Sequence, residues 1–375
     1  MSLGLLGALI AAGLVGPLFR YSRIFSVPIA VGEIFVGIVL GKSWLGIVPV
    51  DDPTLRTLAT IGFALLMLTA GSHIDYRLVT KKVVLAKSIL ILVLNFLCAA
   101  VLGYGISHIA HFNNWKLLTV IAFSSSAAFV VPLVAQMAPS ESLVVLLAQV
   151  TIADTVAFLL LPFVTEKAGH LKAALGAGVI LAVAFILYLI LREINSRGWI
   201  VRMHEASKKD QLALELRISL SLVLLLAALA LRLHASTMVA GFSLGIVLAA
   251  IGVPRRLARQ LFAVSEGLFS PLYFIWLGAS IDIRSALHHR DALILTFLLC
   301  LISFLSHLPA LIFGASLKNV SLATAQLGIP AAAVTLASAN GMMDPGTAGA
   351  IMLSTLGTLV LSSLFLHTPR EVVPV

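Results

Sequence analysis

The sequence predicts an all-α integral membrane protein of about thirteen transmembrane helices. Three observations support this: the composition, the length of the apolar runs and the distribution of positive charge. Hydrophobic residues make up 60% of the 375 residues, charged residues make up 11%, and the mean hydropathy is +1.08. A soluble domain carries about a quarter charged residues, so the composition excludes that class.

Charged or Pro/Gly/Asn-rich breaks divide the chain into thirteen apolar stretches. A hydrocarbon core of roughly 30 Å takes about 20 residues of helix, and most stretches approach or exceed this length. The first stretch has no basic residue before it and is expected to be a retained span rather than a cleaved signal. The predicted spans are 3–19, 24–41, 55–71, 83–110, 116–138, 141–164, 170–192, 213–232, 236–252, 264–280, 291–316, 320–340 and 345–368.

Positive charge is unequally distributed between the two ends of these spans. With the N-terminus outside, the segments predicted to be cytoplasmic hold 17 of the 25 Lys and Arg residues, and the opposite side holds 8. This bias predicts an outside N-terminus and a cytoplasmic C-terminus in the cell (inner) membrane. The net charge of +9 is explained by this bias, with contact to anionic membrane lipid, and no nucleic-acid partner is expected.

The spans are arranged as two sets of six around a middle span. The boundaries are a first repeat at about 1–165, a linker helix at about 170–192 and a second repeat at about 213–368, within one transport domain of residues 1–375. The second set enters the membrane from the opposite side, which is the inverted repeat of many secondary transporters. The hydrophilic segment between Arg192 and Arg217 leaves no room for a soluble domain, and no cytosolic regulatory domain is expected.

Helix-breaking residues fall at matching places in the fifth and twelfth spans. Interruptions in both halves indicate a site near the midplane that is built by broken helices. The alternative is that such small and polar patches only allow close helix packing. The residues are Ser124, Ser125 and Ser126 in the fifth span, with Pro132 further on, and Gln326, Gly328 and Pro330 in the twelfth.

Most charged residues lie near the ends of the predicted spans, and three ionisable residues stand out as exceptions. Asp154 is near the middle of the sixth span, where a carboxylate costs on the order of 3 kcal/mol. Such a group suits alternate binding of a proton and a metal cation, because either neutralises it; the alternative is a protonated structural Asp bonded to Ser or Thr. His307, in the eleventh span, is either a partner of Asp154 that titrates near neutral pH or a hydrogen bonder between helices. Glu33, in the second span, is expected to be structural; the alternatives are a second polar site, an acid at a dimer interface and a lipid-facing group near a headgroup.

No nucleotide-binding signature occurs in the sequence, which indicates that an ion gradient, rather than ATP, supplies the energy. The two cysteines, Cys98 and Cys300, lie inside apolar runs and are read as buried small residues. No enzymatic activity, no cofactor and no metal other than the transported cation are expected.

Several segments resemble the cation:proton antiporter superfamily, in the branch that includes sodium/proton exchangers and glutathione-gated potassium efflux transporters. Pro28 to Gly41 is similar to the family stretch P-x-x-x-G-E-I-x-x-G-x-x-L-G. Leu66 to Asp75 resembles the family's L-F-x-A-G-L-E-I-D, Ala122 to Ala127 its A-L-S-S-T-A, and Phe274 to Asp282 its F-F-V-x-x-G-x-S-I-D. The resemblance covers nearly the whole chain and implies the sodium/proton antiporter fold, with crossed broken helices.

The resemblance also implies site residues. The family has a Gln followed by an acidic or Asn-Asp pair on the sixth span, where Gln149 and Asp154 match, so Asp154 is expected to bind the ion. Ala153 stands at the first position of that pair, and His307 stands where the family usually has Lys or Arg. These two departures bear on stoichiometry and on the choice between Na⁺ and K⁺.

The sequence therefore predicts an antiporter that exchanges a monovalent cation, Na⁺ or K⁺, for H⁺. Ser124, Ser125, Thr151 and the carbonyls of the broken helices would supply oxygen ligands, and a homodimer is expected. Spans five, six, eleven and twelve are expected to form a core that moves against a scaffold including spans two and nine. The alternatives are a non-transporting or channel-like homologue and an organic-anion symporter of the same architecture, although no Arg that would pair with an anion lies mid-span.

Overall fold

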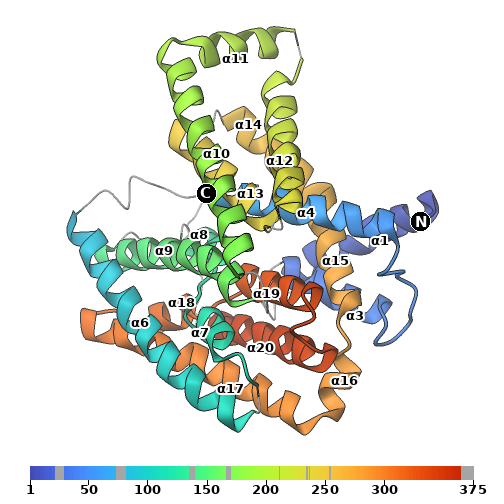
Figure 1. Ribbon diagram of the computed structural model, residues 1–375, viewed down its shortest axis with the longest axis vertical. Helices are drawn as coiled ribbons and strands as arrows, with labels where there is room; N and C mark the ends of the chain where they lie inside the picture. The colour runs from blue at the N-terminus through green and yellow to red at the C-terminus, as the bar shows by residue number, and fades with distance from the viewer. Residues whose placement is uncertain are drawn as a thin grey trace. The chain divides into compact units, whose positions relative to one another are not determined.

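The computed structural model describes residues 1–21, 29–72, 82–110, 112–134, 140–165, 170–210, 212–233, 235, 237–252 and 255–364. These residues form helices joined by short turns and contain no strand, which confirms the predicted all-α class (Figure 1). Pro28 and Asp75, which begin and end two of the segments that resemble the family, lie outside the described residues.

The chain divides into two compact units, each assembled from separate parts of the sequence. Unit 1 comprises Met1–Pro17, Gly32–Arg77 and Thr165–Asp282, and unit 2 comprises Leu18–Val31, Leu78–Val164 and Ile283–Val375. Both units therefore combine residues from both predicted repeats. The spans that carry the predicted ion site all lie in unit 2.

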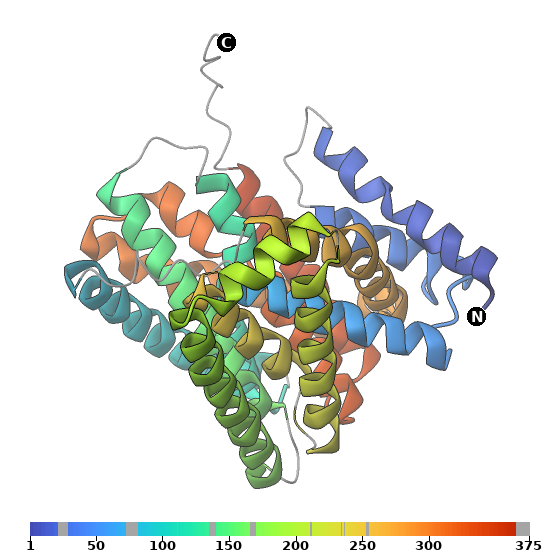
Figure 2. The same cartoon turned by 90° about the horizontal axis from the view of Figure 1, so that it is seen from above.

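Unit 1 is built around the helix pair α4 and α13, with α10 and α12 packed on α13. Figures 1 and 2 show α10 and α12 beside each other, with the short helix α11 joining their ends. Its helices are α1 (Leu3–Gly13), α4 (Pro53–Ser72), α10 (His170–Ser196), α11 (Trp199–Lys209), α12 (Leu214–Arg232), α13 (Thr237–Ile251), α14 (Arg255–Val264), the π-helix η1 (Ser265–Phe269) and α15 (Ser270–Ser280). Two helices have residues in both units: α2 (Val15–Tyr21) and α3 (Ile29–Leu40), most of which lies in unit 1.

Glycines allow the helices of unit 1 to approach each other closely. A Cβ added to Gly241 or Gly245 of α13 would come within 2.2 Å of the carbonyl oxygen of Ala64 and 2.3 Å of that of Leu68, both on α4. On α15, Gly278 lies equally close to the backbone of α3. Small residues spaced four apart let membrane helices pack backbone against backbone, where a larger side chain would hold them apart.

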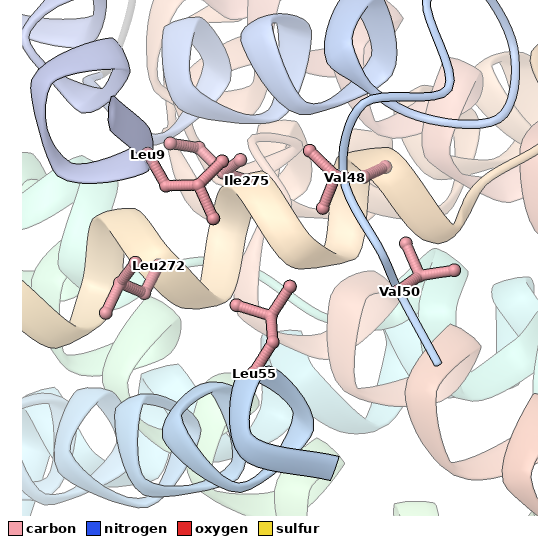
Figure 3. Packing of buried hydrophobic residues seen from close by; sticks show 7 residues of the cluster. Leu9, Val48, Val50, Leu55, Leu272 and Ile275 are labelled. Carbon is pink, nitrogen blue, oxygen red and sulfur yellow. The ribbon is translucent and has the colours of Figure 1, made fainter. Parts of the chain in front are cut away.

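An apolar cluster surrounds α15 in unit 1 (Figure 3). Leu272 and Ile275 of α15 face Leu9 of α1 and Leu55 of α4, and all four are almost fully buried. Val48 and Val50, from the turn between α3 and α4, complete the cluster.

Unit 2 is organised by α6, which packs on α7, α9 and α17, and by α20, which packs on α17. Two of its predicted spans are each split into two short helices, and a third changes from α to 3-10 geometry. The helices are α6 (Lys82–Ile109), α7 (Trp115–Phe123), α8 (Ala127–Val134), α9 (Glu141–Val164), α16 (Ile283–His288), α17 (Arg290–His307), the 3-10 helix η2 (Leu308–Phe313), α18 (Leu317–Ala323), α19 (Gly328–Ala339) and α20 (Pro345–Leu364).

Each of the thirteen predicted stretches overlaps at least one helix of the structure. Among the described residues, nine helices are long and apolar enough to cross a membrane, and three shorter apolar helices occur at Leu3–Leu18, Ile29–Leu40 and Thr237–Ile251. The number of crossings and the inverted repeat therefore stay predictions. The sequence analysis assigned no helix to the segment that forms α11.

Candidate ion-binding site

The two interrupted helices of unit 2 cross at their unwound segments. Residues 124–126 separate α7 from α8, and residues 324–327 separate α18 from α19. The backbone N–H of Ser126 donates to the carbonyl oxygen of Ala325 at 2.7 Å, and the Ser125 hydroxyl donates to that of Ala323, also at 2.7 Å. The interruptions predicted from sequence therefore meet within one unit, and each segment satisfies backbone groups that the other segment would leave unpaired.

Polar side chains satisfy the carbonyls released where α7 ends. The Ala122 carbonyl accepts from the Gln326 amide at 3.3 Å and from the Ser306 hydroxyl at 2.9 Å. The Ser124 hydroxyl donates back to Ile121 in its own helix. Gly328 is the first residue of α19, and Pro330 lies in the first turn of α19, where the missing N–H of proline breaks no helical hydrogen bond.

Asp154 lies near the middle of α9 and is 5% exposed. One carboxylate oxygen, Oδ2, accepts from the backbone N–H of Ala127 at 3.0 Å. Ala127 is the first residue of α8, so the carboxylate meets the partial positive charge of a helix N-terminus. Within the described part of the chain, Oδ1 has no hydrogen-bond partner, which leaves this oxygen available to a proton or a cation.

Thr151 precedes Asp154 by three residues on α9, a spacing that places both on one side of the helix. The Thr151 side chain is half-buried, and its carbonyl accepts from the Thr155 hydroxyl at 2.8 Å. The hydroxyls of Ser124 and Ser125 both donate to carbonyls, so their oxygen lone pairs face outward from those bonds. These oxygens are of the type that hard monovalent cations prefer over nitrogen or sulfur.

His307, the last residue of α17, is fully buried. Its Nδ1 lies 2.7 Å from the carbonyl oxygen of Ser303, and because a carbonyl only accepts, Nδ1 carries a proton in this arrangement. Its Nε2 lies 3.3 Å from the Ser125 hydroxyl. His307 thus contacts the unwound segment that follows α7 directly.

The structure does not join His307 to Asp154 in an ion pair. Among the described residues, His307 has serine hydroxyls and one carbonyl as partners, and Asp154 has one backbone N–H. Residues 125–127 connect the two side chains, because Ser125 contacts His307 and the backbone N–H of Ala127 binds Asp154. The predicted contact is therefore indirect, through this segment.

Glu33 belongs to unit 1, whereas the crossing is built from residues of unit 2. Glu33 lies on α3, is 3% exposed, and has Glu266 of η1 as an electrostatic neighbour.

The sequence analysis missed Asn95 of α6, which is 1% exposed. In the amide orientation that suits its neighbours, Asn95 accepts from Gln149 Nε2 at 3.0 Å and donates to the Ser306 carbonyl at 3.0 Å. The available signal was that Asn95 is the one carboxamide in the apolar sequence of α6. A buried amide of this kind is retained only when its hydrogen bonds are satisfied.

Two crossed, interrupted helices beside a buried carboxylate define the class of this protein: a polytopic membrane protein with the architecture of a secondary transporter. The family profile described as "Sodium/hydrogen exchanger, transmembrane" matches residues 9–370. The chain therefore belongs to the sodium/hydrogen exchanger family, which confirms the superfamily resemblance.

Two relatives and one solved structure extend the comparison. The chain is 25% identical to "Putative Na(+)/H(+) antiporter YjbQ" of Bacillus subtilis over 93% of its own length, and it spans 59% of that relative. It is also 25% identical to "Probable Na(+)/H(+) antiporter 3" of Methanocaldococcus jannaschii, over 69% of this chain and 67% of the relative.

The fold is similar to that of the sodium proton antiporter MjNhaP1 from Methanocaldococcus jannaschii. The TM-score is 0.66 at 18% identity, and the match covers 96% of this chain and 95% of the other. This similarity confirms the predicted antiporter fold.

Proposed function

We propose that this protein exchanges a monovalent cation, Na⁺ or K⁺, for H⁺ across the cell (inner) membrane, and that Asp154 is the group that binds both. The observation that supports this most directly is the environment of Asp154. One oxygen of this buried carboxylate is held by the N-terminus of α8, and the other has no partner among the described residues, so the group needs a proton or a cation to neutralise it.

Oxygen atoms near Asp154 in the sequence and fold are suited to replace the water ligands of a bound cation. Ser124 and Ser125 directly precede α8, whose first N–H binds Asp154, and Thr151 lies one turn before Asp154 on α9. We assign their oxygens, with the carbonyls of the unwound segments, as ligands of the cation. Exchange follows because the empty, ionised carboxylate is costly in the membrane, whereas the protonated and cation-bound states are neutral and can change their exposure at lower cost.

The family and the names of the two relatives agree with this chemistry. We extend it to this chain as a homodimer with an outside N-terminus and a cytoplasmic C-terminus. The second candidates are a channel-like or non-transporting homologue and an organic-anion symporter.

One experiment separates these functions. Purified protein is reconstituted into proteoliposomes loaded with a pH-sensitive dye, and Na⁺ or K⁺ is added outside. Exchange predicts counterflow of protons that requires the cation and stops when the cation gradient is removed. Cation uptake without proton counterflow would indicate a channel-like protein, and proton movement that requires an organic anion would indicate a symporter.

A further inference from the structure

The helix that carries His307 is interrupted directly after that residue. α17 ends at His307 and continues as the 3-10 helix η2. Pro309 lacks the N–H that would donate to the carbonyl of Leu305, and the change to 3-10 geometry shifts the following donors to carbonyls three residues back. In this tighter turn the Leu305 carbonyl accepts from the backbone N–H of Leu308 instead, and Pro309 has no N–H to donate to the Ser306 carbonyl.

Two side chains of α6 reach this turn. Asn95 donates to the Ser306 carbonyl at 3.0 Å, and Cys98 donates through its thiol to the Leu305 carbonyl at 3.8 Å. Asn95 and Cys98 are three residues apart, so both lie on one side of α6. The side chains of α6 therefore bind the two consecutive carbonyls that precede His307.

Asn95 also links this turn to the helix that carries Asp154. Its Oδ1 accepts from Gln149 of α9 at 3.0 Å, and its Nδ2 additionally donates to the carbonyl of Ile91 at 3.2 Å. One carboxamide thus uses both ends of its amide group and connects three helices. Gln149 precedes Asp154 by five residues on α9, and Ser306 precedes His307 by one.

We propose that Asn95 is a positioning residue of the exchange site: its amide holds the His307 turn of α17 and Gln149 of α9 in one hydrogen-bonded arrangement. This inference rests on the proposed function. The hydrogen-bond partners of Asn95 among the described residues are Gln149, Ser306 and Ile91, so Asn95 acts on the site through the turn it binds. Loss of the amide frees that turn, and His307 then no longer holds Ser125, one of the proposed cation ligands, in place.

The test compares Asn95→Leu with Ser88→Ala. Ser88 lies two turns earlier on α6 and donates to the Val145 carbonyl of α9 at 3.3 Å, so its removal also breaks a buried bond between α6 and α9, away from His307. We expect Asn95→Leu to raise the KM for Na⁺ at least fivefold per folded transporter, and Ser88→Ala to leave KM unchanged. If the Leu variant does not fold, Asn95→Ser replaces it in the test. The Ser hydroxyl bonds within its own helix, so this variant also removes the links to Gln149 and Ser306.

A double-mutant cycle separates positioning from a general loss of packing. The effects of Asn95→Leu and His307→Gln on KM should be strongly non-additive, since the first acts through the second. Full additivity, or an unchanged KM in Asn95→Leu, would overturn the proposal.

Amide hydrogen exchange supplies a readout that does not depend on transport. Peptides covering residues 303–313 should exchange faster in Asn95→Leu and not in Ser88→Ala. If the wild-type protein shows no cation/proton exchange, the proposed function fails, and this measurement alone decides the role of Asn95: local deprotection supports it, and unchanged protection overturns it.

Discussion

At the scale of single residues, the proposed site depends on one carboxylate, and a single one of its two oxygens has a hydrogen-bond partner among the described residues. Asp154 receives one backbone hydrogen bond and retains one free oxygen within the described residues. In the proposed exchange a proton and a cation compete for that oxygen, and the neutral amide of an asparagine would offer neither of them a negative charge.

Asp154→Asn should therefore abolish exchange while the protein still inserts and folds, because the amide keeps the shape and removes the charge. The measurement is dissipation of a pH gradient in proteoliposomes. Asp291→Asn is the control, since Asp291 is an exposed acid at the start of α17 in the same unit. Wild-type dissipation in Asp154→Asn would show that another group carries the ion.

Ser124 and Ser125 offer a matched pair of adjacent hydroxyls with different partners. Ser124 bonds only within its own helix, whereas Ser125 bonds to the facing segment and contacts His307. Ser125→Ala leaves the buried Ala323 carbonyl without this donor, which costs about 1–3 kcal/mol. We expect Ser125→Ala to lower both the thermal stability and the exchange rate clearly more than Ser124→Ala, as measured by melting in detergent and by the dye assay; equal effects would contradict the crossing contact.

At the scale of helices, packing in unit 1 depends on glycines that lie so close to the backbone of a neighbouring helix that no larger side chain fits there. Gly176 and Gly178 of α10 test this within one helix. A Cβ on Gly176 would lie 2.5 Å from the carbonyl oxygen of Leu233, whereas a Cβ on Gly178 would meet nothing within 4 Å.

Gly176→Ala should destabilise the protein by about 1–3 kcal/mol, because the backbone must move to admit the methyl group. Gly178→Ala should be neutral or stabilising by up to about 1 kcal/mol, because alanine is the better helix former at an open position. Melting temperatures of the two variants in the same detergent provide the measurement, and the reverse order would show that α10 packs differently.

At the scale of the whole molecule, the bias of Lys and Arg predicts the orientation. A reporter fused after Val375 should read as cytoplasmic, and a reporter placed in the 197–213 segment should agree with it. Activity of the first fusion only on the outer side would show that the number of spans is wrong by an odd number.

The charge moved per cycle is also a property of the whole molecule. The site has one carboxylate, because Ala153 stands where a second acid would be. We therefore expect one H⁺ to replace one cation, so that no net charge crosses the membrane in a cycle. The measurement is the rate of Na⁺/H⁺ exchange in proteoliposomes with a potential imposed by valinomycin, and we expect a rate that is independent of that potential. A steep dependence would refute electroneutral exchange and assign a proton to His307, in which case His307→Gln should remove the dependence.

The sequence by itself determined the membrane class, the position of every predicted apolar stretch on a helix, the family and the place of both interruptions. These properties follow from local composition: apolar length sets a span, and Ser124–Ser126 or Gly328 weakens a helix wherever it is folded. The sequence also marked Asp154, because an acid inside an apolar run is costly in any arrangement.

Only the tertiary structure decided which of these groups meet. It grouped residues from both halves of the chain into each unit, made the two interruptions cross, and placed His307 against Ser125 rather than against Asp154. It also showed Asn95 to be a partner of Gln149 and Ser306. A hydrogen bond between helices depends on the rotation and separation of both, and these are set by packing over the whole unit, which no local pattern of residues encodes.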